Sequence, residues 1–350
     1  SVRSSTRIDI VSSVSNAEYI ALKKLIKERG LLDKHPWFFI GVIALKVGML
    51  VASIVILFLV DNLWIQALNA VFMGFVLAQI GFTSHSACHR QIFHKVAWND
   101  AIGIFLGNLL LGLSAEWWTG KHNAHHAHPN RDGLDPDLDV PVVAFTPAQA
   151  ESCRGIWRWM VKYQAFLFFP LLTLQGYALR EVSYRFVLGP DSRRRGIEIA
   201  MMALNLVWYL ALPIIALGPW AGIGFILISQ AFFGAYLGSV FAPNHKGMLI
   251  VDDNTPIDFL RLQVLTARNV SGHPITDFWY GGLNYQIEHH LFPSLPMHRL
   301  REASKVVKEF CAKRGISYHE TSMIQSYREI LGYLHEIGAS LRTPKAVSSA

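Results

Sequence analysis

Residues 64–89 read WIQALNAVFMGFVLAQIGFTSHSACH, and this stretch joins the two features that decide the fold. Its first part, residues 64–83, contains no charged side chain and has the length of one bilayer-crossing helix, which takes about 20 residues. His85 and His89 follow at once, four positions apart. On a helix this spacing places both imidazoles on one face. The stretch therefore predicts a membrane span followed by a pair of candidate metal ligands.

Three further apolar runs have the length of a membrane span. Very short connectors, around residues 61–62 and 218–219, join the runs in pairs. The sequence therefore predicts an all-α integral membrane protein with four transmembrane helices in two hairpins. Besides residues 64–83, the predicted spans are residues 37–60, 197–217 and 220–242.

The composition agrees with this class of protein. The chain is 52% hydrophobic and only 16% charged, and its mean hydropathy is +0.29. These values are unusual for a water-soluble domain. The net charge is +7, but the basic residues lie between apolar runs and form no basic stripe with interleaved aromatics. We therefore expect contact with an anionic membrane surface and none with nucleic acid.

The distribution of basic residues predicts the orientation. Neither connector contains Lys or Arg, whereas the N-terminal and middle segments are rich in both. By the positive-inside rule, both termini and the middle segment are expected on the cytoplasmic side. The basic residues of the N-terminal segment are Arg3, Arg7, Lys23, Lys24, Lys27, Arg29 and Lys34. The expected organisation is a cytoplasmic segment 1–36, a membrane domain 37–242 with a cytoplasmic insertion 84–196, a cytoplasmic helical cap 243–340, and a disordered tail 341–350.

Two more apolar stretches, residues 101–118 and 163–179, fit either spans or interfacial helices. If both crossed the bilayer, the histidines between them would lie on the side opposite to His85. We therefore expect interfacial or re-entrant helices against the cytoplasmic leaflet. In the cap, apolar residues at helical spacing over residues 300–311 and 324–341 predict two amphipathic helices with packing roles.

Eight of the fifteen histidines are candidate metal ligands. A lone histidine is usually a surface or hydrogen-bonded core residue. Three groups at metal-ligand spacing do not fit that explanation, because many buried ring nitrogens would lack partners. The groups are His85 and His89; His122, His125 and His126; and His289 and His290, which follow Gln286 at the same spacing; His245, just beyond the fourth predicted span, is the eighth candidate.

Residue type alone does not identify the metal, since imidazole binds zinc, copper, iron and nickel. A structural zinc is closed by four ligands, usually including cysteine. The three cysteines, Cys88, Cys153 and Cys311, are scattered and form no zinc motif or disulfide framework. Eight histidines exceed one zinc site and fit two metal ions with roughly four ligands each.

The motifs resemble those of a known family. His85-Ser-Ala-Cys-His89, His122-Asn-Ala-His-His126 and Gln286-Ile-Glu-His-His290 are similar to the three histidine boxes of membrane fatty acid desaturases. The phrases at 282–293 and Asp135-Pro-Asp137 resemble the front-end branch, in which Gln replaces the first His of the third box. Bacterial acyl-coenzyme A desaturases share this form of the box. The resemblance covers roughly residues 35–315.

The resemblance implies a di-iron enzyme that uses dioxygen as co-substrate to convert two adjacent methylenes of a long acyl chain into a double bond. The acyl carrier is left open between coenzyme A, acyl carrier protein and a lipid. The haem motif His-Pro-Gly-Gly of fused cytochrome b5 domains is absent. Electrons are therefore expected from a separate ferredoxin or an NAD(P)H-dependent flavin/iron–sulfur reductase. The implied iron ligands are His85, His89, His122, His125, His126, His289 and His290, with His245 as an extra ligand placed as in stearoyl-coenzyme A desaturases.

Further residues near the motifs are candidates for supporting roles. Gln286 is expected to bind metal weakly, to act through water, or to support the ligands. The tunnel candidates also fit ordinary interfacial or core aromatics. Possible additional ligands are His94 and His128; candidates for orienting the rings are Glu116, Asn123, Asp137, Asn284 and Glu288; candidates for an acyl tunnel are Trp117, Trp118, Trp279 and Tyr280.

Two other functions fit parts of the pattern. A lipid hydroxylase or ketolase uses similar boxes on the same scaffold. A non-enzymatic zinc-binding membrane receptor or transporter belongs to a different class. The number of histidines exceeds one zinc site, and no acidic residue lies deep within a predicted span to form an ion pathway. Both observations weigh against the second alternative.

Overall fold

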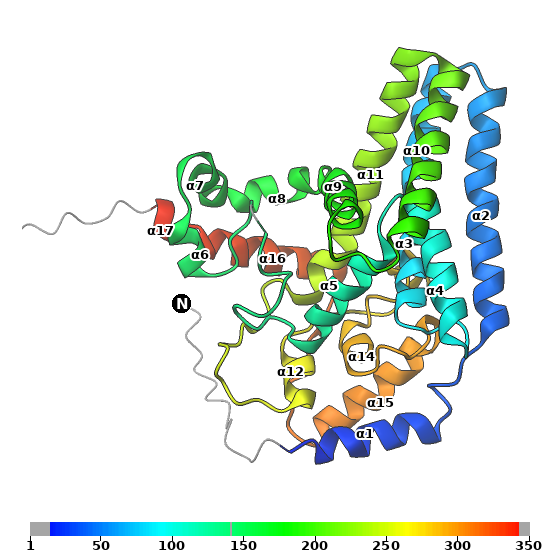
Figure 1. Ribbon diagram of the computed structural model, residues 1–350. Coiled ribbons are helices and arrows are strands. Elements are labelled where there is room, and N and C mark those ends of the chain that lie inside the picture. The colour runs from blue at the N-terminus through cyan, green and yellow to red at the C-terminus, as the bar shows by residue number, and fades with distance from the viewer. Residues whose placement is uncertain (1–14, 141, 343–350) are drawn as a thin grey trace, which may run out of the picture.

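The computed structural model describes residues 15–140 and 142–342, and it is mostly helical (Figure 1). Four helices stand together as a bundle and have the length and composition of membrane spans, in agreement with the four predicted spans. In the apolar 18-residue stretch of each helix, about 56% is buried in α3 and in α11, but only 22% in α2 and in α10. Helices α3 and α11 therefore form the centre of the bundle. The four helices are α2 (Pro36–Leu59), α3 (Leu63–Cys88), α10 (Arg195–Leu217) and α11 (Pro219–His245).

Local capping explains where these helices begin. Pro36 and Pro219 occupy first-turn positions, where the missing N–H costs nothing. The Asn62 side chain accepts hydrogen bonds from the backbone N–H groups of Trp64 and Ile65, at 2.9 and 3.1 Å, and so caps α3. Gly218 takes a positive φ of 80° in the other connector, a conformation that favours glycine.

The ends of the two central helices differ from the sequence prediction. His85 was expected just after the second span, but it lies inside α3, which continues to Cys88. His245 was expected beyond the fourth span, but it is the last residue of α11. The apolar pattern stops earlier than the helices do, because their last turns are buried among other polar groups and do not face lipid.

Polar side chains inside the bundle find partners there. Lys46 is only 7% exposed, and its ammonium donates to the Gln79 carbonyl oxygen at 2.6 Å and to Thr83 Oγ1 at 2.8 Å. The Gln79 side chain in turn donates to Tyr236 OH at 2.8 Å. These bonds join α2, α3 and α11. Lys46 therefore faces the bundle and does not reach the interface.

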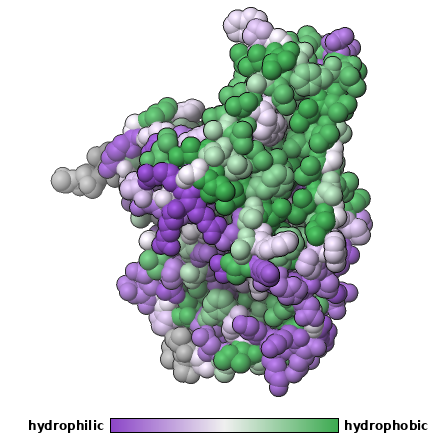
Figure 2. Space-filling view, turned by 45° about the vertical axis from the view of Figure 1, so that its right-hand side comes forward, coloured by the Kyte–Doolittle hydropathy of each residue, from purple (hydrophilic) through white to green (hydrophobic). Residues whose placement is uncertain are grey.

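The outer surface of the bundle is apolar. A hydrophobic region covers this end of the molecule in Figure 2, and hydrophilic side chains concentrate at the opposite end. Trp64 and Trp220 are 84% and 85% exposed, and both lie next to the connectors. Such a surface, with aromatic residues at its edge, is typical of a protein embedded in a bilayer.

The first ambiguous stretch forms a sharply bent segment. Helix α4 (Val96–Ile104) continues as a π-helix (Phe105–Leu111), and α5 (Ala115–Ala127) follows at an angle of 111°. Gly112 at the bend has φ of 70°, and a Cβ there would lie 2.4 Å from side-chain atoms of Arg180 and Asn205. The Asn205 amide donates to the carbonyl oxygens of Leu109 and Leu110, at 2.9 and 3.1 Å. Contacts with Arg180 and Asn205, which lie on other helices, therefore stabilise this bend.

The second ambiguous stretch is divided between two helices, neither of which is long enough to cross a bilayer. Figure 1 shows α7, α8 and α9 extending sideways from the bundle. Apolar side chains such as Trp157 and Phe166 are exposed on this arm. The helices are α6 (Pro147–Ser152), α7 (Gly155–Lys162), α8 (Gln164–Leu172) and α9 (Gln175–Leu188).

The residues after His245 form the cap, together with α1 (Ala17–Glu28). Buried apolar faces of α1 and α15 pack in one core, as the amphipathic pattern predicts for α15. A parallel pair of two-residue strands, β1 (Asn269–Val270) and β2 (Glu320–Thr321), departs from the all-helical prediction in the described residues. The cap helices are α12 (Phe259–Leu265), α13 (Pro274–Tyr280), α14 (Gln286–Leu291), a 3-10 turn (Met297–Arg299), α15 (Leu300–Ala312), α16 (Met323–Ile337) and α17 (Ala339–Arg342).

Two predictions concern residues at the ends of the chain. Arg3 and Arg7, part of the basic N-terminal segment, lie outside the described residues. The tail predicted over residues 341–350 also lies largely outside them, but its first two residues belong to α17.

Candidate metal centre

The fold brings all eight predicted ligand histidines together from four elements. The residues come from the end of α3, from α5, from the end of α11 and from α14, and each is at most 9% exposed. Their ring nitrogens form two sets, and within each set the nitrogens lie within 4.8 Å of one another. The first set is His85, His89, His122, His126 and His289, and the second is His125, His245 and His290.

The distances between ring nitrogens fit bound metal. His122 Nε2 lies 2.8 Å from His85 Nε2 and 3.0 Å from His126 Nε2. In the second set, His245 Nε2 lies 2.9 Å from His290 Nε2. When two neutral imidazole nitrogens face each other, only one hydrogen bond can form between them. Hydrogen bonds alone therefore cannot satisfy all three nitrogens that meet at His122. Nitrogens bonded at right angles to one ion at about 2.1 Å would lie about 3 Å apart.

Ring nitrogens without a hydrogen-bond partner also indicate a metal site. The Nε2 atoms of His89 and His289 are buried and have no hydrogen-bond partner among the described residues. A buried nitrogen without a partner destabilises the folded state, unless a bound ion or another polar group interacts with it. The donor set therefore fits one metal ion in each histidine set, divided five and three, where the sequence predicted roughly four each.

Burial also keeps the rings in the form that binds metal. Burial, with further contributions from neighbouring histidines, holds the pKa values of His122, His126, His289 and His290 well below the usual 6.5. A neutral imidazole is the form that coordinates a metal ion. For His125 burial also lowers the pKa, but the carboxylates of Asp137 and Asp135 outweigh it and raise the pKa.

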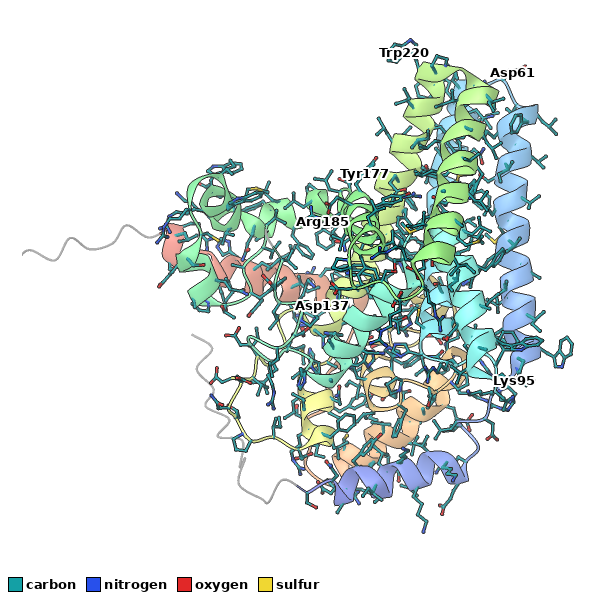
Figure 3. All side chains as sticks on the ribbon, viewed as in Figure 1. Asp61, Lys95, Asp137, Tyr177, Arg185 and Trp220 are labelled. Carbon is teal, nitrogen blue, oxygen red and sulfur yellow. The ribbon has the colours of Figure 1, made fainter. Side chains whose placement is uncertain are left out.

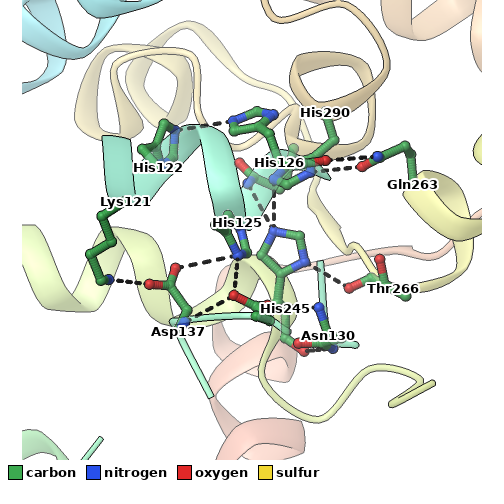
Figure 4. A network of polar contacts seen from close by, with 12 residues as sticks. Lys121, His122, His125, His126, Asn130, Asp137, His245, Gln263, Thr266 and His290 are labelled. Atoms are coloured by element: carbon green, nitrogen blue, oxygen red, sulfur yellow. Dashed lines mark hydrogen bonds and ion pairs between the residues drawn. The ribbon is translucent and has the colours of Figure 1, made fainter. Parts of the chain in front are cut away.

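Oxygen acceptors orient three of the rings (Figure 4). His245 Nδ1 donates to the Thr266 carbonyl oxygen at 2.8 Å, and His290 Nδ1 lies 2.9 Å from Gln263 Oε1. Each bond leaves Nε2 of the ring for the metal. Such outer contacts fix the tautomer and the direction of a ligating imidazole.

Two aspartates do the same for His125. His125 Nδ1 lies 2.9 Å from Asp135 Oδ1 and 3.5 Å from Asp137 Oδ2. Asp135 also accepts from the backbone N–H of Asn130, at 2.7 Å, and Asp137 is paired with Lys121. The Asp-Pro-Asp phrase is therefore an outer support of the centre, and sequence reasoning had named only Asp137 for this role.

The other residues proposed to orient the rings have different partners. Glu288 accepts from Asn269 and from Tyr318, at 2.7 and 2.8 Å, and Asn284 donates to Asp277 at 2.9 Å. Asn123 is exposed on α5. The Glu116 carboxylate accepts from backbone N–H groups at the start of α10. None of these contacts reaches a ligand ring.

Gln286 lies beside the second set. Its Nε2 is 3.1 Å from His245 Nε2, and its Oε1 is buried without a hydrogen-bond partner in the described part of the chain. Rotation of this carboxamide by half a turn would direct its oxygen at the centre. His94, which is exposed, and His128, which is half-buried, belong to neither set.

A cavity of about 200 Å³ reaches the centre. Its wall includes His122, His125, His245 and Gln286, together with apolar residues of α8, α9 and α11. A second cavity, of about 40 Å³, lies against His85. The two cavities share three wall residues: Trp118, Leu179 and Phe241.

One of the four aromatic residues proposed for a tunnel lines these cavities. The Trp118 ring stacks on His122, with centroids 5.3 Å apart and planes 14° from parallel. Trp279 packs on Tyr236, and Tyr280 contacts Tyr327, both away from the cavity walls. Trp117 packs against the bundle core.

Comparisons with known proteins agree with the site. The fatty acid desaturase family matches residues 62–322. The chain is 27% identical over 343 residues to the acyl-lipid (9-3)-desaturase of Physcomitrium patens, covering 95% of this chain and 65% of that protein. It is 31% identical over 323 residues to the Delta(5) fatty acid desaturase of Caenorhabditis elegans, covering 88% and 70%.

A third relative is the Delta(6)-fatty-acid desaturase of the same nematode, which is 28% identical over 347 residues, covering 93% of this chain and 76% of that protein. The chain thus spans about two thirds to three quarters of the length of these relatives. A membrane-embedded, histidine-rich oxidoreductase is the class that the fold and the site define. The chain belongs to the fatty acid desaturase family.

Proposed function

We propose that this chain is an oxygen-dependent di-iron desaturase that introduces a double bond into a long acyl chain. The observation that carries the proposal is the convergence of two buried histidine sets on a largely apolar cavity. The named relatives are desaturases of fatty acids and acyl-lipids, which agrees with this function.

Each of the two histidine sets would bind one iron. His85, His89, His122, His126 and His289 would hold one iron. His125, His245 and His290 would hold the other, with the Gln286 carboxamide beside it. Bound iron would supply the activation of dioxygen that removes hydrogen from an unactivated C–H bond. Asp135, Gln263 and Thr266 keep the rings directed at the ions.

The cavity walls position the substrate. Phe241 and Leu179 provide apolar contacts in the walls of both cavities, and Trp118, which also lines both, stacks on His122. Apolar walls exclude water and bind methylene groups through the hydrophobic effect. Two adjacent methylenes held beside the histidines would react in preference to others, because effective concentration depends on geometry.

The acyl chain would be bound to coenzyme A, acyl carrier protein or a lipid. Electrons would come from a separate ferredoxin or an NAD(P)H-dependent flavin/iron–sulfur reductase. The basic residues outside the spans would favour the approach of an acidic redox protein.

We also infer that the spans form two hairpins, with both termini and the metal centre cytoplasmic. In support, the connectors carry no Lys or Arg, and in Figure 3 Asp61 and Trp220 lie at the far end of the bundle from Asp137 and Lys95. In a variant without native cysteines, Asp61→Cys should react with an impermeant thiol reagent on intact cells. Lys305→Cys should react only after lysis, and the reverse pattern would contradict this orientation.

Lipid profiling of a host that expresses the protein tests the activity. We expect new unsaturated acyl chains with the wild type and none with His289→Ala. His335→Ala, which changes an exposed histidine of α16, is the matched control and should behave as the wild type. Purified wild type that forms no unsaturated product with iron, reductant, dioxygen and acyl substrate would refute the proposal.

Two other outcomes would favour the alternatives. Products that gain oxygen would indicate a hydroxylase or ketolase on the same scaffold. A metal content of one zinc and no iron would indicate a zinc-binding membrane protein.

A further inference from the structure

The wall of the main cavity contains two lysines, and one of them, Lys246, has no ion-pair partner among the described residues. Lys246 directly follows His245, and its side chain lines the same cavity as His125, His245 and Gln286. Its ammonium lies 5.1 Å from the centroid of the Phe145 ring. No hydrogen bond or ion pair of this ammonium is found within the described residues.

The other lysine in the cavity wall already has an ion-pair partner. Lys121 lines the same cavity, but its ammonium is paired with the Asp137 carboxylate, which also lies 3.5 Å from the His125 ring. Lys121 is therefore part of the support of the metal centre. The Asp137 and Asp135 carboxylates act on the Lys246 ammonium only through their charges and form no hydrogen bond with it. Its hydrogen-bond donors therefore remain for another group, and a half-buried ammonium is costly without an oxygen partner.

The backbone of Lys246 is held firmly. The buried Arg268 guanidinium donates to the carbonyl oxygens of Lys246 and Pro243, at 2.9 and 2.7 Å, and it also binds Glu329 at 2.8 Å. The turn after α11 therefore has a fixed place relative to His245. A group bound by the Lys246 ammonium would lie within the reach of one lysine side chain from this fixed turn.

The walls of the two cavities differ in their chemistry. Lys121, Asp137 and Lys246 belong to the wall of the larger cavity and not to that of the smaller one. The smaller cavity is lined mainly by apolar residues such as Leu111, Phe233 and Leu237. An acyl chain has the same asymmetry, with a polar head at its carboxyl end and an apolar methyl end.

We propose that Lys246 binds the oxygen atoms at the carboxyl end of the acyl substrate and thereby sets which methylenes lie beside the histidines. The ligand chemistry is a carbonyl or phosphate oxygen of a thioester- or ester-linked acyl chain. The methyl end would pass Trp118 into the smaller cavity. This inference rests on the proposed desaturase function and adds the residue that determines the position of the double bond.

Binding of saturated acyl probes to the purified iron-loaded protein tests the proposal without turnover. The probes are palmitoyl-coenzyme A and palmitoyl-lysophosphatidylcholine, measured without reductant. Lys246→Met removes the ammonium but keeps an unbranched side chain, and Lys246→Arg keeps the charge. Lys305→Met, which changes an exposed lysine of α15, is the control. Iron content and melting temperature are measured for every variant.

We expect Lys246→Met to weaken binding of at least one probe by about ten- to a hundredfold, the range of a lost charge-assisted hydrogen bond. Lys246→Arg should bind within a few-fold of the wild type, and Lys305→Met should match it. During turnover, Lys246→Met should have a raised KM and give double bonds at several positions. The probe that is affected identifies the source of the head group: thioester or lipid ester.

Three results would overturn the proposal. One is wild-type affinity for both probes together with a single product position in Lys246→Met. Another is an equal loss of binding in the Met and Arg variants. The third is a loss of iron from both, which would make Lys246 a structural support of His245. If the wild type binds probes through Lys246 but forms no unsaturated product, the proposed activity fails while the head-group site remains.

Discussion

Gln263 lies where two of the segments that carry candidate metal ligands meet, because its carboxamide contacts both of them. Its Oε1 lies 2.9 Å from His290 Nδ1, and its Nε2 donates to the His126 carbonyl oxygen at 2.9 Å. The side chain is fully buried. Gln263→Leu keeps the approximate size but removes the acceptor, so the His290 ring loses its orientation. We expect the affinity for iron to fall about ten- to a hundredfold, measured by metal analysis after dialysis against a weak chelator.

The conservative variant separates orientation from packing. Gln263→Glu keeps an acceptor for His290 but replaces the donor to His126 with a carboxylate oxygen. It should still hold more iron than Gln263→Leu, which has no acceptor at all. Equal iron contents in the wild type and Gln263→Leu would show that the His290 ring needs no acceptor.

A second residue-scale prediction concerns pH and the pair His35 and His298, whose ring nitrogens lie 3.1 Å apart. Burial, with the neighbouring His35 and Arg299, lowers the pKa of His298 to about 4. The folded state therefore favours the neutral ring. The stability that this preference contributes is present above the usual pKa of 6.5 and is lost as pH falls through about 4.

Replacement of His298 tests this pH dependence. His298→Gln should lose less of its melting temperature than the wild type when the pH is lowered from 6.5 to 4. The two proteins differ only at this position, so the difference between their profiles reports on His298 and its contact with His35. Parallel profiles would contradict the assignment.

The sequence predicted the candidate ligands far better than their supports. Spacing along a helix identifies His122 and His126 as neighbours, because they share one helical face. Gln263 is 137 positions from His126, and no local pattern marks it. The same limit applies to Lys246, whose role depends on a cavity formed by several elements. Contacts between distant segments are visible only once the chain has folded.

At the scale of elements, two glycines allow α9 to cross α11 closely. A Cβ at Gly234 would lie 2.7 Å from the Gly176 nitrogen and 2.8 Å from the Leu172 carbonyl oxygen. These are backbone atoms and cannot move alone, so Gly234→Ala must push α8 and α9 away from α11. We expect a loss of about 1–3 kcal/mol in stability, seen as a lower melting temperature.

The same helix supplies the control for this substitution. Gly224 lies on α11 with open space around its Cβ position, so Gly224→Ala should leave the melting temperature unchanged or raise it slightly. Because α8 and α9 also line the main cavity, Gly234→Ala should weaken acyl binding as well. Equal melting temperatures for the two alanine variants would refute the close crossing.

The spans were predictable as elements, and their environment explains why. Lipid-facing helices need long apolar runs, and those runs are visible in one sequence. The sequence did not show whether residues 101–118 cross the membrane, because their bend at Gly112 depends on Arg180 and Asn205 from other helices. The extension of α3 to Cys88 was missed for a similar reason, since its polar last turn is buried against the cap.

At the scale of the whole molecule, the candidate metal centre joins the bundle to the cap. His85 and His245 come from the two central helices, whereas His289 and His290 come from α14 in the cap. The four elements are far apart in the sequence and meet at this point. The unfolded chain offers no such arrangement, so metal binding favours the folded state.

Removal of metal should therefore lower the stability of the entire protein. A ligand present at a hundred times its Kd contributes about 2.7 kcal/mol, and a chain of this size shifts by roughly 2 °C for each kcal/mol. We expect chelation to lower the melting temperature by at least about 5 °C, measured by tryptophan fluorescence in detergent. Reloading with iron should restore it, and chelator should shift His289→Ala less than the wild type. Identical melting temperatures with and without metal would mean that histidine packing alone holds the cap to the bundle.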